Sequence, residues 1–259
     1  MDLQRLGHAV ALRQAGHVEE ALEEFAAMTA QNTDPEETAS LLLNEARCCH
    51  LLGRFAEARE RLSRAYAIAP RTQGLLYLEL ENAFLLSHEG ERHKALGTLE
   101  RLIADYGPLI AGPEHRVLFE QVTATRGTLL ADLGRYKEAR PLLEQSLSFD
   151  PRTTEMIAVV YYLGLCSLKL GKSADAKERF QEVLRMDGRR DLTTLAHLGL
   201  GSIYFHEGAH AKALMEFEWC LNNGEGGPPR TYLYKWLAVT AKALGMHEDA
   251  ERYEKLADD

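Results

Sequence analysis

One short segment, which opens with Gly and has Ala five residues later, recurs seven times along this 259-residue chain. The recurring glycines follow one another at intervals of 37 residues, with a single interval of 44: Gly16, Gly53, Gly90, Gly134, Gly171, Gly208 and Gly245. A regular period of this length marks an array of stacked units, each packing only against its neighbours. The period therefore constrains the architecture more than any other feature of the sequence.

Three further positions of each repeat indicate what the unit is. The glycine stands between two helical patterns, where it can adopt the left-handed conformation that ends a helix. The residue five positions later is always alanine: Ala21, Ala58, Ala95, Ala139, Ala176, Ala213 and Ala250. The residue seven positions before the glycine is always small: Ala9, Ala46, Ala83, Gly127, Gly164, Gly201 and Ala238. Small residues at matched points let two antiparallel helices approach closely, so each repeat is predicted to be a helical hairpin.

A large apolar residue follows the alanine by four positions in six repeats: Phe25, Leu62, Leu99, Leu143, Phe180 and Phe217. The seventh repeat has Glu254 there, with Tyr253 beside it, in a charged final helix. A charged last helix is what an array needs where it ends against water.

This order of small residue, Gly, Ala and a large apolar residue, followed by a helix-ending Pro, resembles the tetratricopeptide repeat (TPR) family. Pro70, Pro151 and Pro228 supply the last element, and the resemblance runs from about Leu3 to Leu256. It implies helical pairs stacked into a right-handed superhelix whose concave face binds protein segments. We therefore predict an all-α fold, a right-handed α-solenoid of about seven TPR-like helix-turn-helix repeats with a period of 37, filling residues 1–259 as a single domain.

The 44-residue interval adds an insertion at residues 104–115, which contains the pairs Gly107-Pro108 and Gly112-Pro113. Gly-Pro pairs break helices, so a loop is predicted here, between sub-arrays 1–107 (repeats 1–3) and 114–259 (repeats 4–7). The loop is either a plain longer connection or a joint that lets the two sub-arrays change their angle or that touches a ligand.

Charge and composition exclude several classes of function. A formal net charge of −9 and a pI near 5.6 disfavour a nucleic-acid reader, which usually carries a basic surface. No run reaches 18 apolar residues, so membrane insertion is not expected. The cysteines lack metal-ligand spacing and fit buried reduced thiols, which favours a cytoplasmic protein: Cys48, Cys49, Cys166 and Cys220.

Two short motifs suggest chemistry that their context does not support. Residues 206–210, His-Glu-Gly-Ala-His, match a zinc-protease pattern, but Gly208 is the turn glycine, so the histidines belong to different helices. Gly199-Leu200-Gly201 lacks the third glycine and the preceding strand of a dinucleotide site. We expect no metal, no cofactor and no enzymatic activity.

The resemblance implies that the first helix of each pair lines the concave face, which gives a set of candidate partner-binding residues. Family members that bind a C-terminal carboxylate have Lys and Asn where this chain has Leu6 and Val10, so that arrangement is predicted to be absent although Asn44 fits it. Each candidate either contacts a partner or belongs to the core: Asn44, Arg47, Tyr77, Glu81, Phe84, Thr128, Tyr161, Tyr162, Ser202, Phe205, Lys235 and Trp236.

One position departs from the family pattern. The residue before the small column is normally apolar, yet repeats two to four have Glu45, Asn82 and Arg126. Buried polar groups need partners, so these side chains are expected either to reach solvent or to bond to one another in a polar ladder across neighbouring repeats.

The predicted function is a non-enzymatic scaffold or adaptor that binds a peptide or helix in its groove. The alternative is a sensory module that binds a small molecule or a short signalling peptide; an enclosed pocket of a few hundred Å³ would favour it. Partners are expected to be proteins or peptides, without nucleic acid, and self-association through an exposed edge of the first repeat is a further possibility.

Overall fold

The same turn closes all seven hairpins. The computed structural model describes residues 2–68, 73–150, 155–186, 189–224 and 226–258. Each of the seven turn glycines has a positive φ, between 72° and 89°. The N–H of the next residue donates to the carbonyl five residues earlier in every turn, as from Arg54 to Cys49 and from Lys172 to Ser167, both at 2.8 Å. This is the Schellman motif, which explains why glycine stands at this position.

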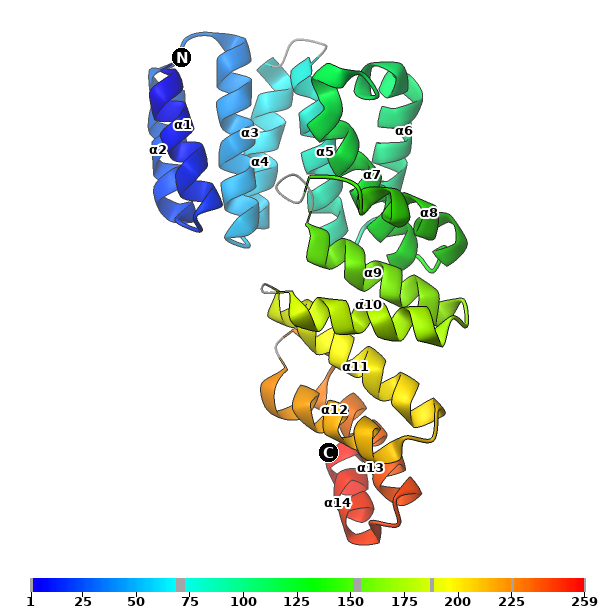
Figure 1. The fold of residues 1–259 in the computed structure, drawn as a ribbon. Helices are drawn as coiled ribbons and strands as arrows, with labels where there is room; N and C mark the ends of the chain where they lie inside the picture. The colour runs from blue at the N-terminus through cyan, green and yellow to red at the C-terminus, as the bar shows by residue number, and fades with distance from the viewer. Residues whose placement is uncertain (1, 69–72, 151–154, 187–188, 225, 259) are drawn as a thin grey trace. The chain divides into compact units, whose positions relative to one another are not determined.

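The described residues form fourteen α-helices and one short 3₁₀ helix, without a β-strand (Figure 1). The all-α prediction is confirmed. The helices are α1 (Leu3–Gln14), α2 (Val18–Gln31), α3 (Pro35–Leu51), α4 (Phe55–Ile68), α5 (Gln73–His88), α6 (Arg92–Ile110), η1 (Pro113–His115), α7 (Arg116–Asp132), α8 (Tyr136–Ser146), α9 (Met156–Lys169), α10 (Ser173–Arg185), α11 (Arg190–His206), α12 (His210–Asn223), α13 (Arg230–Ala243) and α14 (His247–Asp258). Pro70 and Pro151 lie outside the described residues, and Pro228 lies just before α13.

The chain divides into two compact units, Met1–Leu129 and Leu130–Asp259, with the boundary inside α7. Helices that follow one another along the chain pack together from α1 to α6 in the first unit and from α8 to α14 in the second. First helices of adjacent hairpins also touch, as α3 does with α5 and α9 with α11. Each unit is thus a stack of helical hairpins, as an α-solenoid requires.

The small residues that recur in every repeat form the helix–helix contact that the sequence predicts. All seven alanines after the turns are at most 1% exposed, and the large residues that follow them are buried in the first six repeats. A Cβ added at Gly164 would lie 2.8 Å from the Phe180 ring, and one added at Gly201 would lie 2.6 Å from Phe217. The small column therefore makes room for an aromatic ring of the second helix.

The last hairpin is closed differently from the others. Tyr253 is 8% exposed and fills the place that Phe or Leu takes elsewhere. Glu254, beside it, is exposed and accepts a hydrogen bond from Lys242 at 2.6 Å. The buried face of α14 consists of Ala250 and Tyr253, so its charged residues face outward.

The first half of the insertion is helical, which corrects the predicted loop. Helix α6 continues through Gly107 and Pro108 to Ile110, and Ala111 donates its N–H to the Gly107 carbonyl at 2.9 Å. Pro108 lies in the last turn, where its missing N–H removes only one helical bond. The pair Gly112-Pro113 does end the helix and opens η1. A joint between residues 1–107 and 114–259 stays a prediction.

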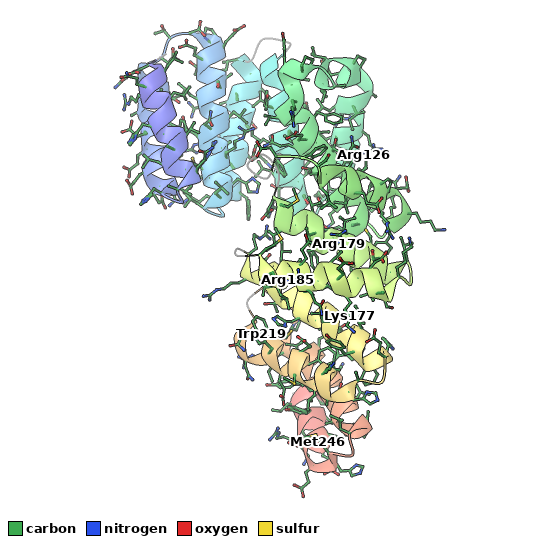
Figure 2. The ribbon with its side chains drawn as sticks, viewed as in Figure 1. Arg126, Lys177, Arg179, Arg185, Trp219 and Met246 are labelled. Carbon is green, nitrogen blue, oxygen red and sulfur yellow. The ribbon has the colours of Figure 1, made fainter. Side chains whose placement is uncertain are left out.

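Two positions pair each hairpin with the next one along the chain. The first lies six residues after the turn glycine of one hairpin, and the second lies one residue before the turn glycine of the next; the residue types at both positions vary. Arg59 and Glu89 form an ion pair at these positions, and so do Lys177 and Glu207 at 2.9 Å; Lys177 is labelled on α10 in Figure 2. Other neighbours carry two leucines, Leu22 with Leu52 and Leu214 with Leu244. Hairpins four and five carry a mismatch, Arg140 with Leu170.

Candidate functional site

A group of polar side chains on the first helices of hairpins one to three is the strongest candidate site. We call Arg13, Asn44, Arg47, His50 and Glu81 the inner cluster; they come from α1, α3 and α5. Asn44, Arg47 and His50 are three residues apart on α3, so they share one helix face. Arg13 and His50 occupy the same repeat position, three residues before a turn glycine.

Glu81 is the buried centre of the inner cluster. It is 3% exposed, and its two carboxylate oxygens lie 3.1 Å from Arg47 Nε and 2.8 Å from His50 Nδ1. A buried carboxylate is costly unless hydrogen-bond donors satisfy it, and the Arg47 guanidinium and the His50 ring lie within hydrogen-bond distance. Glu81 therefore orients Arg47 and His50, and its contact with a partner stays a prediction.

Arg13 is bound differently, because its neighbour is neutral. Its Nη1 donates to Asn44 Oδ1 at 2.7 Å, and no ion pair joins it to a carboxylate among the described residues. Partial burial, and then the nearby charge of Arg47, lower the pKa of the Arg13 guanidinium. Arg13 is thus a partly buried cation that no carboxylate of the described residues contacts directly, although the nearby charge of Glu81 acts weakly to raise its pKa.

Aromatic side chains border the inner cluster. The Arg47 guanidinium lies 6.0 Å from the Tyr77 ring centroid, within cation–π range. The His50 ring is 6.3 Å from Phe84 and 4.6 Å from His88, centroid to centroid. Tyr77 and Phe84 are half-buried, so the cluster combines charged donors with partly exposed apolar surface.

The second unit has an aromatic face on α11 and α13. The rings of Phe205 and Trp236 are 5.5 Å apart, and Trp236 stacks on buried Phe217 at 5.2 Å. Tyr232 and Val239, on either side of Trp236 along α13, are 44% and 48% exposed. Residues spaced by three or four positions share a helix face, so α13 presents exposed apolar side chains in a row.

The repeats of this chain match models of a known protein family. A family model described as tetratricopeptide repeat matches residues 6–71 and 160–218, and a second model of the same description matches residues 121–145. Together they cover more than half of the chain. The chain belongs to the tetratricopeptide repeat family. No curated protein matches it.

Solved structures of other proteins have the same fold as this TPR protein. A tetratricopeptide repeat protein from Parabacteroides merdae is 19% identical, with a TM-score of 0.57 over 98% of this chain and 91% of that one. Pseudomonas aeruginosa pilF is 21% identical, with a TM-score of 0.61 over 85% of this chain and 90% of that one. The chain also matches a structure of the APC/C hetero-tetramer Cut9-Hcn1 at 14% identity and a TM-score of 0.66, over 98% of this chain and 47% of that one.

The structure brings together some of the predicted groove residues and separates others by burial. Asn44, Arg47, Tyr77, Glu81 and Phe84 meet in or around the inner cluster. In the second unit, Tyr162, Ser202, Phe205, Lys235 and Trp236 keep some exposure on first helices. Tyr161 is 8% exposed and packs on Phe180, and burial raises the pKa of its hydroxyl. Thr128 donates its hydroxyl to the Thr125 carbonyl at 3.0 Å, within α7.

The sequence prediction missed Arg13, His50 and His88. Reading the column three residues before each turn glycine would have found Arg13 and His50 together. Their proximity to Glu81 arises because α1, α3 and α5 place successive repeats side by side, which one column alone does not reveal.

No hydrogen bond or ion pair joins Glu45, Asn82 and Arg126 in the part of the chain that the structure describes. Glu45 instead accepts from Arg61 Nε at 3.0 Å and from the Thr29 hydroxyl at 2.5 Å. Arg126 lies 4.0 Å from Glu100. The second helices thus supply the partners of Glu45, whereas the Arg126 Nε is buried without a hydrogen-bond partner among the described residues.

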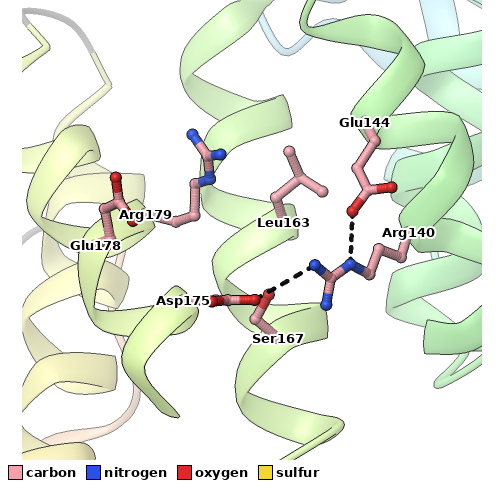
Figure 3. A pocket seen from close by; sticks show the side chains of 7 residues that line it. All are labelled: Arg140, Glu144, Leu163, Ser167, Asp175, Glu178 and Arg179. Atoms are coloured by element: carbon pink, nitrogen blue, oxygen red, sulfur yellow. Dashed lines mark hydrogen bonds and ion pairs between the residues drawn. The ribbon is translucent and has the colours of Figure 1, made fainter. Parts of the chain in front are cut away.

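A small pocket of about 180 Å³ lies in the second unit between α8, α9 and α10 (Figure 3). Its wall carries Arg140, whose Nε donates to Glu144 at 2.7 Å and whose Nη2 lies 3.4 Å from Asp175. Arg179 is paired with Glu182 at 2.7 Å. Most of these charges compensate one another, and the volume is below the roughly 300–1,000 Å³ usual for ligand pockets.

Neither a metal site nor a membrane-spanning helix is found in the described ranges. His206 ends α11 and His210 begins α12, with the Gly208 turn between them. Across those ranges, His, Cys, Asp and Glu side chains form no group of three that could hold a metal ion. No described helix has the length and the hydrophobicity that crossing a bilayer requires.

Proposed function

We propose that this TPR protein is a non-enzymatic scaffold or adaptor that binds a peptide or a helix along the inner faces of its first helices. The observation that carries the proposal is the row of exposed apolar side chains on α13, Tyr232 and Val239, beside the Phe205–Trp236 pair. Exposed apolar surface of this kind commonly marks an interaction site, and an amphipathic helix or extended apolar segment is suited to cover it.

The family supports the same proposal, since TPR repeats are generally protein–protein interaction modules. The absence of catalysis, a cytoplasmic location and the absence of a nucleic-acid partner belong to the proposal as expectations. Self-association through the first repeat is a further expectation, and Leu3, 75% exposed, is its most exposed apolar side chain.

The small-molecule alternative receives less support. The pocket of about 180 Å³ is small, and the pairs of Arg140 with Glu144 and of Arg179 with Glu182 occupy most of the charges in and beside it. The first helices, by contrast, offer extended surface with partly exposed aromatic groups. A peptide partner therefore fits the described residues better than a small ligand.

Selection of 12-residue peptides from a random phage-displayed library tests the proposal. Wild type is expected to enrich peptides with apolar residues, and Val239→Glu should weaken a class of them at least tenfold because it places a charge on the apolar row. Val239 is about half-exposed, so the variant should keep its fold, as circular dichroism can verify. Met215→Glu is the matched control, since Met215 is 69% exposed on the second helix α12. Failure to enrich any peptide, or equal loss in both variants, would contradict the proposal.

A further inference from the structure

We propose that Arg13 and Arg47 form an anchor for one Asp or Glu side chain within a bound protein segment. The inference rests on the proposed function and names the chemistry that the first unit recognises. Three observations on the described residues lead to it: a cation that forms no ion pair, a second guanidinium with free N–H groups, and apolar positions on both sides.

Arg13 differs from the other partly buried arginines of the first two hairpins. Arg5 pairs with Glu24 at 2.7 Å, Arg47 with Glu81 at 3.1 Å and Arg61 with Glu45 at 3.0 Å. Arg13 donates instead to the neutral Asn44 carbonyl, and its guanidinium lies 5.9 Å from the Phe25 ring centroid, so it forms no ion pair with the described residues. A cation held partly out of water without a counter-ion destabilises the folded state, and an anionic ligand would remove that cost.

Arg47 supplies the second half of the anchor. It uses Nε for Glu81, while its two terminal nitrogens make no hydrogen bond to the described residues. Its charge acts on Arg13, so the two guanidinium groups are close enough to influence each other. Guanidinium groups donate paired N–H bonds that match the two oxygens of a carboxylate, which makes this the ligand group that fits best.

The surroundings favour a carboxylate inside a protein segment over a polyanion or a chain end. The chain carries a net charge of −9, which repels a polyanion, whereas a single carboxylate is attracted by two guanidinium groups, only one of which is paired with Glu81. Leu6 and Val10 precede Arg13 on the same face of α1. On the other side, Tyr77 and Phe84 belong to α5, the first helix of the hairpin after the one that carries Arg47. Apolar positions on both sides of the arginines suit a segment that continues in both directions past its acidic residue.

The test uses the full chain and the displayed 12-residue library, in which the peptides have no free C-terminal carboxylate. Peptides enriched by wild type are re-screened on the double variant Arg13→Gln/Arg47→Gln, with Arg54→Gln as the control. Arg54 belongs to the same unit and its removal costs the same charge as one of the two substitutions, but it forms an exposed pair with Glu19. The class lost on the double variant should contain an invariant Asp or Glu flanked by apolar residues.

The decisive measurement is the affinity of one such peptide and of its Glu→Gln or Asp→Asn form. The amide should bind wild type at least tenfold more weakly, and the two forms should bind the double variant equally, because the charge-assisted bonds are gone. If no enriched class is lost on the double variant, or if the lost class lacks an acidic residue, the anchor is overturned and the proposed function stands. If wild type enriches no peptide, both fail.

Stability separates a binding role from a structural one. Arg13→Gln keeps a donor for Asn44 and removes a partly buried charge, whose burial lowers its pKa. The midpoint of thermal unfolding should therefore stay constant or rise in this variant while acidic peptides bind more weakly. A clear fall in the midpoint would assign Arg13 to holding α1 on α3 and would overturn the anchor.

Discussion

At the scale of single residues, burial decides the chemistry of the four thiols. All four cysteines are buried and unpaired. Burial raises the pKa of Cys48 and of Cys166 to about 11, and that of Cys220 to about 12, from an ordinary value of 9.0. Because the thiolate is the reactive form, these groups should behave as small apolar side chains in the folded protein.

We predict that native protein at pH 8 reacts slowly with a disulfide reagent that releases a coloured thiolate, and that unfolded protein reacts quickly at all four cysteines. The raised pKa values stabilise the fold fully below about pH 9, and that contribution is lost as the pH rises towards 11 to 12. Rapid reaction of two or more thiols in the native state would contradict the burial.

At the scale of helices, the repeat columns predicted most of the fold. The turn glycines and the two small columns depend on contacts within one hairpin, so sequence spacing alone locates them. The end of α6 could not be located in this way, because Pro108 is tolerated in a last turn that the composition of residues 104–115 does not reveal. For the inner cluster, the sequence pattern predicted Asn44, Arg47 and Glu81 but not their contacts with one another or with Arg13, since Arg13, Arg47 and Glu81 come from three different hairpins.

Two glycines inside helices should respond to alanine in opposite directions. Gly97 lies inside α6 with nothing within 4 Å of an added Cβ, so Gly97→Ala should raise the free energy of unfolding by about 0.5–1 kcal/mol. Gly201→Ala would press against Phe217 and should lower it by about 1–3 kcal/mol. Denaturant titration measures both, and equal effects would contradict the packing of the small column.

At the scale of the whole molecule, both tryptophans, Trp219 and Trp236, belong to the second unit (Figure 2 labels Trp219). Tryptophan fluorescence therefore follows unfolding of that unit, whereas the helical signal in circular dichroism follows both. Arrays in which each repeat touches only its neighbours need not unfold in a single step.

We predict that the two signals give different midpoints in denaturant. Gly97→Ala, in the first unit, should shift the circular dichroism transition and leave fluorescence nearly unchanged, while Gly201→Ala should shift both. Coincident curves for wild type and both variants would show that the two units unfold as one cooperative body.

The side chains at the two paired positions differ from one pair of neighbouring hairpins to the next. Arg59 forms an ion pair with Glu89, and Lys177 with Glu207. In the first two hairpins the same two positions are occupied by Leu22 and Leu52. Most other hairpins carry a leucine where Glu89 stands, as Leu170 does in the hairpin after Arg140, and Arg140 pairs instead with Glu144 and Asp175. The repeats share one backbone design yet differ in the side chains at their junctions, so a shuffled or shortened array would lose these partly exposed ion pairs, each worth about 0–1 kcal/mol.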